Sequence, residues 1–175
     1  MKPDPHAELR RVYRAHVRRV YGFFAYSVDP ATAEDLTSQT FERVVANWGR
    51  FDAGQASEKT WILSIARNAL IDHFRREKHR RAQSLDGEPA LVATLAAAGD
   101  ASDAFLNNAA LVSWLEVLGD RDRTVLALRY AGDLTPAEIA GALGLSIANV
   151  HQIISRSLRR LRELSTDRMP PAGTS

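Results

Sequence analysis

The sequence predicts an all-α protein with two small helical domains joined by an acidic linker. Apolar residues recur at steps of three and four along most of the chain, which is the spacing of an amphipathic helix. No segment alternates apolar and polar residues as a half-buried strand would, and there is no internal repeat. At 175 residues, the chain has the length of one or two domains.

Charge divides the chain into three parts. Residues 1–81 carry 15 Lys and Arg and 10 Asp and Glu. Residues 82–120 carry no Lys or Arg and six Asp and Glu, and residues 121–175 carry eight Lys and Arg and five Asp and Glu. We therefore expect a helical domain over 1–81, a flexible acidic linker over 82–103, a second domain over 104–165 and a disordered tail over 166–175. Two basic ends around an acidic middle indicate two separate contacts with nucleic acid.

Three helices are expected in the first domain, over residues 8–28, 31–48 and 57–81. The first carries most of its arginines outside its apolar face and ends at Asp29-Pro30, a pair that breaks helices. Ten of the thirteen aromatic residues precede residue 75, so we expect this domain to have a core of its own.

The second domain is expected to hold four helices. Its first helix carries Phe105, Leu106, Leu111, Val112, Leu115 and Leu118, and its second carries Val125, Leu126, Leu128 and Tyr130. The last two form a helix-turn-helix: Thr135-Pro136-Ala137-Glu138 has the form of a capping box, Gly144 suits a helix end that needs positive φ, and Ser146 suits the next N-cap. This arrangement is typical of DNA-binding proteins.

The final helix has one apolar and one polar face. Its apolar stripe consists of Val150, Ile153, Ile154, Leu158 and Leu161, and its other face carries Asn149, His151, Gln152, Ser155, Arg156, Arg159 and Arg160. Asn, Gln and Arg are the side chains that recognise base edges in the major groove. We therefore expect this face to bind duplex DNA, the alternative being an ordinary helical hairpin with a solvated face.

A second group of candidate residues lies on the helix over 57–81. Trp61, Ile65, Asn68 and Asp72 follow one another at steps of four, three and four, so they lie near one face of a basic helix. Single-stranded DNA suits such a face, because bases stack on aromatic rings and phosphates follow arginines. Asn68 is also able to bond an extruded base. In the alternative, Trp61 belongs to the core and Asn68 only caps its own backbone.

Taken together, the two regions resemble the extracytoplasmic-function sigma factors, the two-domain initiation subunits of bacterial RNA polymerase. The likeness covers nearly the whole chain and is carried by residues 21–26, 35–41 (DLTSQTF), 61–68 (WILSIARN) and 71–72 in the first half, and by residues 126–130 (LALRY), 135–140 (TPAEIA) and 143–150 in the second. One departure stands at His151-Gln152-Ile153-Ile154, where many members carry a basic or small polar run. The loss of a basic residue at Ile153 bears on phosphate affinity and promoter preference.

The resemblance implies two DNA contacts and one protein contact. The minus-35 contacts would be Asn149, His151, Gln152, Ser155 and Arg156, with Arg159 and Arg160 on phosphates. The minus-ten contacts, which open the duplex and hold a flipped non-template base, would be Trp61, Arg67, Asn68, Asp72, Arg75 and Arg76. The contacts with core RNA polymerase, at the clamp helices of its largest subunit, would be Asp35, Leu36, Gln39, Thr40, Phe41 and Arg43. Core packing is the alternative for Leu36 and Phe41.

The resemblance also implies regulation by an anti-sigma factor, and it places the acidic linker in the channels of the polymerase as a mimic of RNA charge. The competing hypothesis is a stand-alone helix-turn-helix regulator that never binds polymerase. It accounts for the second half of the chain and leaves the helices over 31–48 and 57–81 unexplained.

Other classes of function are disfavoured by composition. Cysteine is absent, which excludes disulfides and thiolate metal sites and favours a reducing compartment. No apolar run approaches the roughly 20 residues that span a membrane, and the N-terminus lacks a signal-peptide core, so we expect a cytoplasmic protein without membrane insertion. The five histidines lack carboxylate partners at metal spacing, and we expect no metal, no cofactor and no enzymatic activity.

Overall fold

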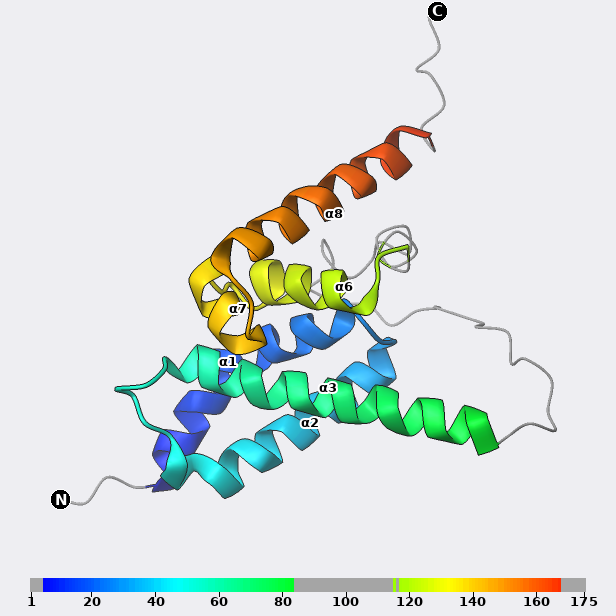
Figure 1. The fold of residues 1–175 in the computed structure, drawn as a ribbon. Helices are drawn as coiled ribbons and strands as arrows, with labels where there is room; N and C mark the ends of the chain where they lie inside the picture. Colours follow the sequence, from blue (N-terminus) through cyan, green and yellow to red (C-terminus); the bar gives the residue numbers. More distant parts are fainter. Residues whose placement is uncertain (1–4, 84–114, 116, 168–175) are drawn as a thin grey trace, which may run out of the picture.

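The computed structural model describes residues 5–83, 115 and 117–167, and within these ranges it is helical and has no strand (Figure 1). The elements are α1 (Pro5–Ala25), α2 (Pro30–Asn47), the 3-10 turn η1 (Trp48–Arg50), α3 (Glu58–Gln83), α6 (Asp120–Leu126), the π-helical turn η2 (Ala127–Ala131), α7 (Pro136–Leu143) and α8 (Ile147–Asp167). The predicted all-α fold is confirmed. The expected linker over 82–103 and the expected helix from residue 103 lie almost wholly outside the described residues.

Helices α1, α2 and α3 pack together as the first half of the molecule. The Asp29 side chain accepts a hydrogen bond from the Thr32 backbone nitrogen at 3.1 Å, and Pro30 occupies the first position of α2. The chain turns before this cap, because the nitrogens of Ser27 and Val28 both donate to the Phe24 oxygen, so α1 ends at Ala25 and not at the predicted residue 28. The core between the three helices includes Val12, Val20, Phe23, Phe24, Leu36, Val44, Ile62, Leu63, Ala66, Ala69 and Leu70.

The helix-turn-helix has the predicted local structure. The Glu138 nitrogen donates to Thr135 Oγ1 at 3.2 Å and the Thr135 nitrogen donates to Glu138 Oε2 at 2.8 Å, which completes the capping box. Gly144 ends α7 with φ of 63°, in the left-handed region. At the start of α8 the Asn149 nitrogen donates to Ser146 Oγ at 3.2 Å. All three predicted signals are confirmed.

A wide turn interrupts the helix that the sequence predicted around residues 125–130. The Gly132 nitrogen donates to the Ala127 oxygen at 2.9 Å, five residues back, so η2 holds one residue more per turn than an α-helix. Tyr130 lies within this turn and is 46% exposed. A Cβ atom at Gly132 would lie 2.6 Å from the Leu128 oxygen, so the turn requires glycine there.

The two halves of the chain pack directly on each other. Helix α1 contacts η2, and α3 contacts α7, as Figure 1 shows for the yellow and orange segments above the blue and green helices. One buried apolar cluster runs through both halves, and its members from the second half include Val125, Leu128, Leu134, Ile139, Val150 and Ile153. Within the described ranges no single helix is long and apolar enough to cross a membrane, although α7 and α8 together pass that test of length and composition across a bend of 108°.

Candidate nucleic-acid interface

The predicted duplex-binding face is exposed on α8. His151, Gln152, Ser155, Arg159 and Arg160 are all exposed, and Asn149 is half-buried. Ile153 is only 2% exposed and packs in the shared core. The isoleucine therefore takes a core position and does not replace a DNA contact on the face that carries Gln152.

Arg156 has a partner inside the protein. Its Nη2 atom donates to both carboxylate oxygens of Asp122, at 3.0 and 2.9 Å, and Ser157 Oγ donates to the same carboxylate at 3.4 Å. Asp122 lies in the first turn of α6, where the helix dipole favours an acidic residue. The Arg156 side chain stays 60% exposed, so the pair positions the guanidinium at the edge of the recognition face. Sequence spacing gave no sign of this partner, 34 residues away.

A small cavity lies between α2 and α3 in the first half. It has a volume of about 290 Å³ and is lined by Arg43, Asn47, Arg50, Trp61, Ile65 and Asn68. The Trp61 ring contacts the rings of Trp48 and Phe51, with centroid distances of 5.9 and 5.4 Å. Trp61 is half-buried, so it both packs in an aromatic cluster and forms a wall of the cavity.

The structure separates the predicted minus-ten residues into two groups. Trp61 and Asn68 line the small cavity, whereas Arg67 and Arg75 line a groove of about 610 Å³ between α3 and the second half. The Asp72 carboxylate forms an ion pair with Arg43 at 3.5 Å, and the Asp72 backbone oxygen accepts a hydrogen bond from Arg76 Nε at 3.2 Å.

Three polar residues that line the cavity were not predicted to contact DNA. Asn47 and Arg50 were not singled out, and Arg43 was assigned to polymerase. Asn47 and Arg50 flank Trp48 at the end of α2, and this local cluster of polar and aromatic residues was the signal available in the sequence.

The predicted polymerase-binding residues lie on two faces of α2. Leu36, Thr40 and Phe41 are buried, and the Phe41 ring packs on Tyr13 with a centroid distance of 4.8 Å. Their burial favours the packing alternative, because a side chain in the core is not available to a partner. Asp35 is exposed, and Gln39 and Arg43 are partly exposed. The exposed face of α2 also presents Glu42 and the apolar Val45, which is 54% exposed.

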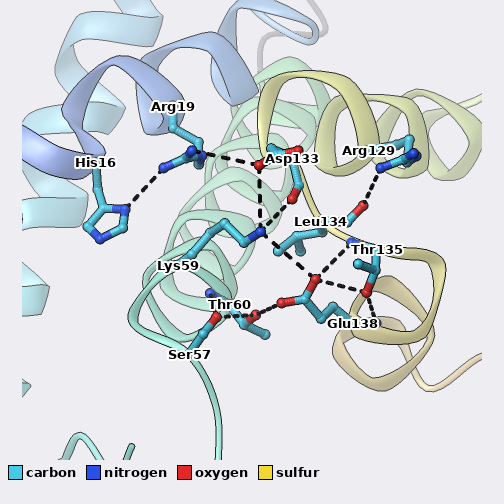
Figure 2. Close-up of polar contacts among 10 residues, drawn as sticks. All are labelled: His16, Arg19, Ser57, Lys59, Thr60, Arg129, Asp133, Leu134, Thr135 and Glu138. Atoms are coloured by element: carbon cyan, nitrogen blue, oxygen red, sulfur yellow. Dashed lines mark hydrogen bonds and ion pairs between the residues drawn. The ribbon is translucent and has the colours of Figure 1, made fainter.

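Polar side chains join the two halves at the rim of the shared core, as Figure 2 shows. Lys59 Nζ donates to the Asp133 backbone oxygen at 2.5 Å and lies 3.8 Å from the Asp133 carboxylate and 4.0 Å from that of Glu138. Thr60 Oγ1 donates to Glu138 Oε1 at 2.9 Å. Arg19 on α1 lies 3.9 Å from the Asp133 carboxylate. We call these five residues the interdomain latch.

The charge of Glu138 is stabilised by its neighbours in the latch. Burial opposes ionisation of this carboxyl, but hydrogen bonds from Thr135 and Thr60 and the nearby ammonium of Lys59 outweigh burial and lower the pKa of Glu138. The same carboxylate completes the capping box of α7, so one side chain both starts the helix-turn-helix and contacts the first half.

A second polar network supports the latch from α1. Arg11 donates to Glu58 Oε1 at 2.5 Å, and this hydrogen bond lowers the pKa of Glu58. The buried His16 ring lies between Glu58, at 3.3 Å, and Arg19, also at 3.3 Å. Across residues 5–83 and 117–167, no three His, Asp or Glu side chains are placed to hold a metal ion.

Comparison with known proteins identifies the family. The family model described as Sigma-70 region 2 matches residues 12–80, and the model described as Sigma-70, region 4 matches residues 114–163. The ECF RNA polymerase sigma factor BldN of Streptomyces coelicolor is 30% identical over 162 residues, which cover 90% of this chain and 60% of BldN. This chain is an extracytoplasmic-function member of the sigma-70 family.

Other relatives match this sigma factor over most of their length. The ECF RNA polymerase sigma factor SigM of Bacillus subtilis is 28% identical over 89% of this chain and 94% of its own. Among solved structures, the sigma factor RpoE of Bartonella quintana, in complex with the anti-sigma factor NepR, superposes with a TM-score of 0.71. It is 24% identical over 94% of this chain and 98% of RpoE, a likeness that shows the fold.

Proposed function

We propose that this sigma factor directs core RNA polymerase to specific promoters by binding a minus-35 duplex and holding a melted minus-ten strand. The observation that carries the proposal is the presence of two distinct candidate surfaces on one chain. The second half exposes an amide- and arginine-rich face on a recognition helix, and the first half has an aromatic-walled cavity. A stand-alone helix-turn-helix regulator would need only the face on the recognition helix.

The chemistry of α8 supports the minus-35 contact. Gln152 is exposed one turn into the helix, and an amide there is able to bond adenine through two atoms. Arg156, held by Asp122, is suited to guanine, whose two major-groove acceptors match a guanidinium. Arg159 and Arg160 lie nearly one turn further along, where phosphates run beside the groove.

The small cavity supports the minus-ten contact. Asn47 and Asn68 supply amide donors and acceptors for the edge of an extruded base, and Trp61 supplies an aromatic wall. Arg43 and Arg50 line the same cavity and are suited to backbone phosphates. Sequence analysis assigned only Trp61 and Asn68 of these five to DNA, and we propose all five.

Two protein partners complete the proposal. The exposed face of α2, with Asp35, Glu42 and Val45, is the candidate surface for the clamp helices of core polymerase. The structural neighbours RpoE of Bartonella quintana and CnrH were solved in complex with the anti-sigma factor NepR and the cytosolic domain of CnrY, respectively. We propose that an anti-sigma factor also binds this chain.

The proposal is tested by transcription in vitro. Core polymerase, with and without the purified protein, is supplied with a library of linear templates that carry a randomised upstream region, and the transcripts are sequenced. We expect transcripts only with the protein present, and their templates to share two short motifs. A protein that binds duplex DNA but yields no transcript and does not co-purify with core polymerase would be a stand-alone regulator.

A further inference from the structure

Helix α6 packs on α8, and a polar cluster joins the two helices beside the recognition face (Figure 1). Both carboxylate oxygens of Asp122 on α6 accept hydrogen bonds from Arg156 Nη2 on α8, and the same carboxylate accepts one from Ser157 Oγ. Ser157 is only 1% exposed, and a buried hydroxyl needs a partner of this kind. The three side chains are therefore connected as one unit, which we call the Asp122 cluster.

Asp122 is the fixed member of the cluster. Its side chain is 19% exposed, whereas that of Arg156 is 60% exposed. The Asp122 carboxylate lies in the first turn of α6, where the helix dipole favours a negative charge, and the hydrogen bond from Ser157 restrains it from the buried side. The position of the carboxylate therefore decides where the exposed guanidinium of Arg156 lies before DNA binds.

The pairing with Asp122 leaves Arg156 with donors for DNA. A guanidinium has five N–H donors, and both hydrogen bonds to Asp122 come from Nη2. Within residues 5–83 and 117–167, Nε and Nη1 of Arg156 make no hydrogen bond. Arg156 lies four residues after Gln152, so the two side chains are neighbours on one face of α8. Arg156 is therefore able to contact a base while Asp122 holds it.

A neighbouring arginine on α8 has a much weaker restraint. Arg159 Nε lies 4.0 Å from the Glu163 carboxylate, and the two side chains are 73% and 68% exposed. An exposed ion pair of this kind contributes little, so Arg159 is able to turn towards a phosphate. Phosphate contacts strengthen binding to every sequence, whereas base contacts distinguish one sequence from another. The two arginines thus differ as a base contact and a phosphate contact should.

An acidic residue at this place also weakens binding to DNA in general. Backbone phosphates lie on both sides of a helix in the major groove, and a carboxylate beside that helix repels them. Such a residue lowers the affinity for all sequences unless it improves the contact with one of them. Holding Arg156 has this effect, because a side chain that is ordered in advance loses less entropy when it meets a base.

We propose that Asp122, which lies outside the helix-turn-helix, is a positioning residue that sets the base preference at one position of the minus-35 element. It directs Arg156 to a guanine and keeps its guanidinium away from the phosphates. This role rests on the proposed function, because it needs α8 to recognise a minus-35 duplex. The alternative is a purely structural bridge between α6 and α8, whose loss would lower stability without changing base preference.

The test uses core polymerase reconstituted with the full-length chain. The templates are the promoters recovered in the transcription experiment above, together with every single-base change in their upstream motif. The variants are Asp122→Asn, which keeps the shape of the side chain and removes its charge, Arg156→Ala, and the double variant. Asp120→Asn is the matched control, because Asp120 is exposed in the same first turn of α6 and carries the same charge.

We expect Arg156→Ala to lower the preference for guanine at one motif position by roughly 5- to 150-fold, the range of one bidentate base contact. Asp122→Asn should lower the preference at the same position by at least about fivefold, and Asp120→Asn should change it at no position. Within the double variant, Asp122→Asn should add nothing to Arg156→Ala, because it acts through that side chain. An unchanged preference with Asp122→Asn, or a further loss in the double variant, would overturn the inference.

Salt dependence gives a second readout that a structural bridge would not alter. Binding of the reconstituted polymerase is measured on a promoter whose upstream motif is scrambled, so that α8 retains only phosphate contacts. Once Asp122→Asn releases it, Arg156 should add about one phosphate contact, which steepens the salt dependence by a slope of about 0.9, or about 3.5-fold in affinity between 50 and 200 mM salt. Asp120→Asn should leave the slope unchanged. Equal slopes for Asp122→Asn and the wild-type chain would show that Asp122 does not keep Arg156 from the phosphates.

Failure of this role and failure of the proposed function are distinguishable. If the wild-type chain yields no transcript, or transcribes without any preference in the upstream motif, the proposed function fails. If the wild-type chain shows a preference that Asp122→Asn retains, only the role of Asp122 fails. Melting temperatures complete the comparison, because a lower melting temperature of Asp122→Asn at unchanged base preference would make the Asp122 cluster a structural bridge.

Discussion

Replacement of Asn68 by alanine should affect stability and function in opposite directions. Asn68 is exposed in the middle of α3, and within the described residues its side chain makes no hydrogen bond. Alanine is the better helix former by up to about 0.7 kcal/mol, so the free energy of unfolding should rise by that amount. For a chain of this size, that gain corresponds to about 1–3 °C in melting temperature.

The same change should weaken promoter opening. An amide that bonds the edge of an extruded base contributes about 1–3 kcal/mol, which is roughly a 5- to 150-fold loss of open complex. Permanganate reactivity of unpaired thymines on a linear promoter measures opening, and run-off product measures its consequence. A template melted beforehand around the minus-ten element is the control, and it should restore most of the product. Normal permanganate reactivity with Asn68→Ala, or a melting temperature lowered by several degrees, would refute this reasoning and make Asn68 a structural residue.

Three further results are expected. In gel shifts on matched and scrambled minus-35 duplexes, Gln152→Ala should weaken binding to the matched duplex only, by about 1–3 kcal/mol, whereas Arg159→Ala should weaken binding to both duplexes equally. Equal losses of affinity for the two duplexes with Gln152→Ala would contradict its base contact. Asp35→Arg should reduce retention on immobilised core polymerase without changing the melting temperature, whereas Leu36→Ala, which truncates a buried side chain, should lower the free energy of unfolding by about 2–5 kcal/mol. Unchanged retention of Asp35→Arg would remove α2 from the docking surface. The folded pKa of Glu138 lies below its ordinary value of 4.5, so its ionised form stabilises the fold above pH 4.5, and this contribution is lost as the pH falls through the folded pKa. The melting temperature of Glu138→Gln should therefore fall less steeply in acid than that of the wild-type chain. Parallel pH profiles of the two proteins would contradict this role of Glu138.

The features that the sequence predicted correctly are those encoded by neighbouring residues. Asp29 with Pro30 defines the start of α2, and Thr135 with Glu138 defines the start of α7, because each pair acts within one helical turn. Gly144 ends α7 for the same local reason, since a left-handed residue is needed there. The apolar periodicity of α8 also correctly divided its buried face from its polar face.

The features that the sequence did not predict depend on residues far apart in the chain. Thr60 and Glu138 are separated by 78 residues, and no periodic pattern links such a pair. Arg156 was assigned to DNA from its place on a polar face, but its partner Asp122 lies on another helix. The π-helical turn at 127–131 holds one extra residue, which helical spacing does not anticipate. Pairings of this kind are set by tertiary packing.

The core that runs through both halves also governs how the protein completes its fold on the ribosome. Among the residues that the structure describes, Leu70 is the last of that core in the first half and Val125 is the first in the second, with about 55 residues between them. At about 5–20 residues per second, the first half emerges some 3–10 s before its covering surface is synthesised. Through that interval the surface around Gly22 and Leu63 is open to chaperones and to other nascent chains. A message that ends between the two halves would therefore yield a product with a permanently uncovered apolar face, a substrate for proteolysis.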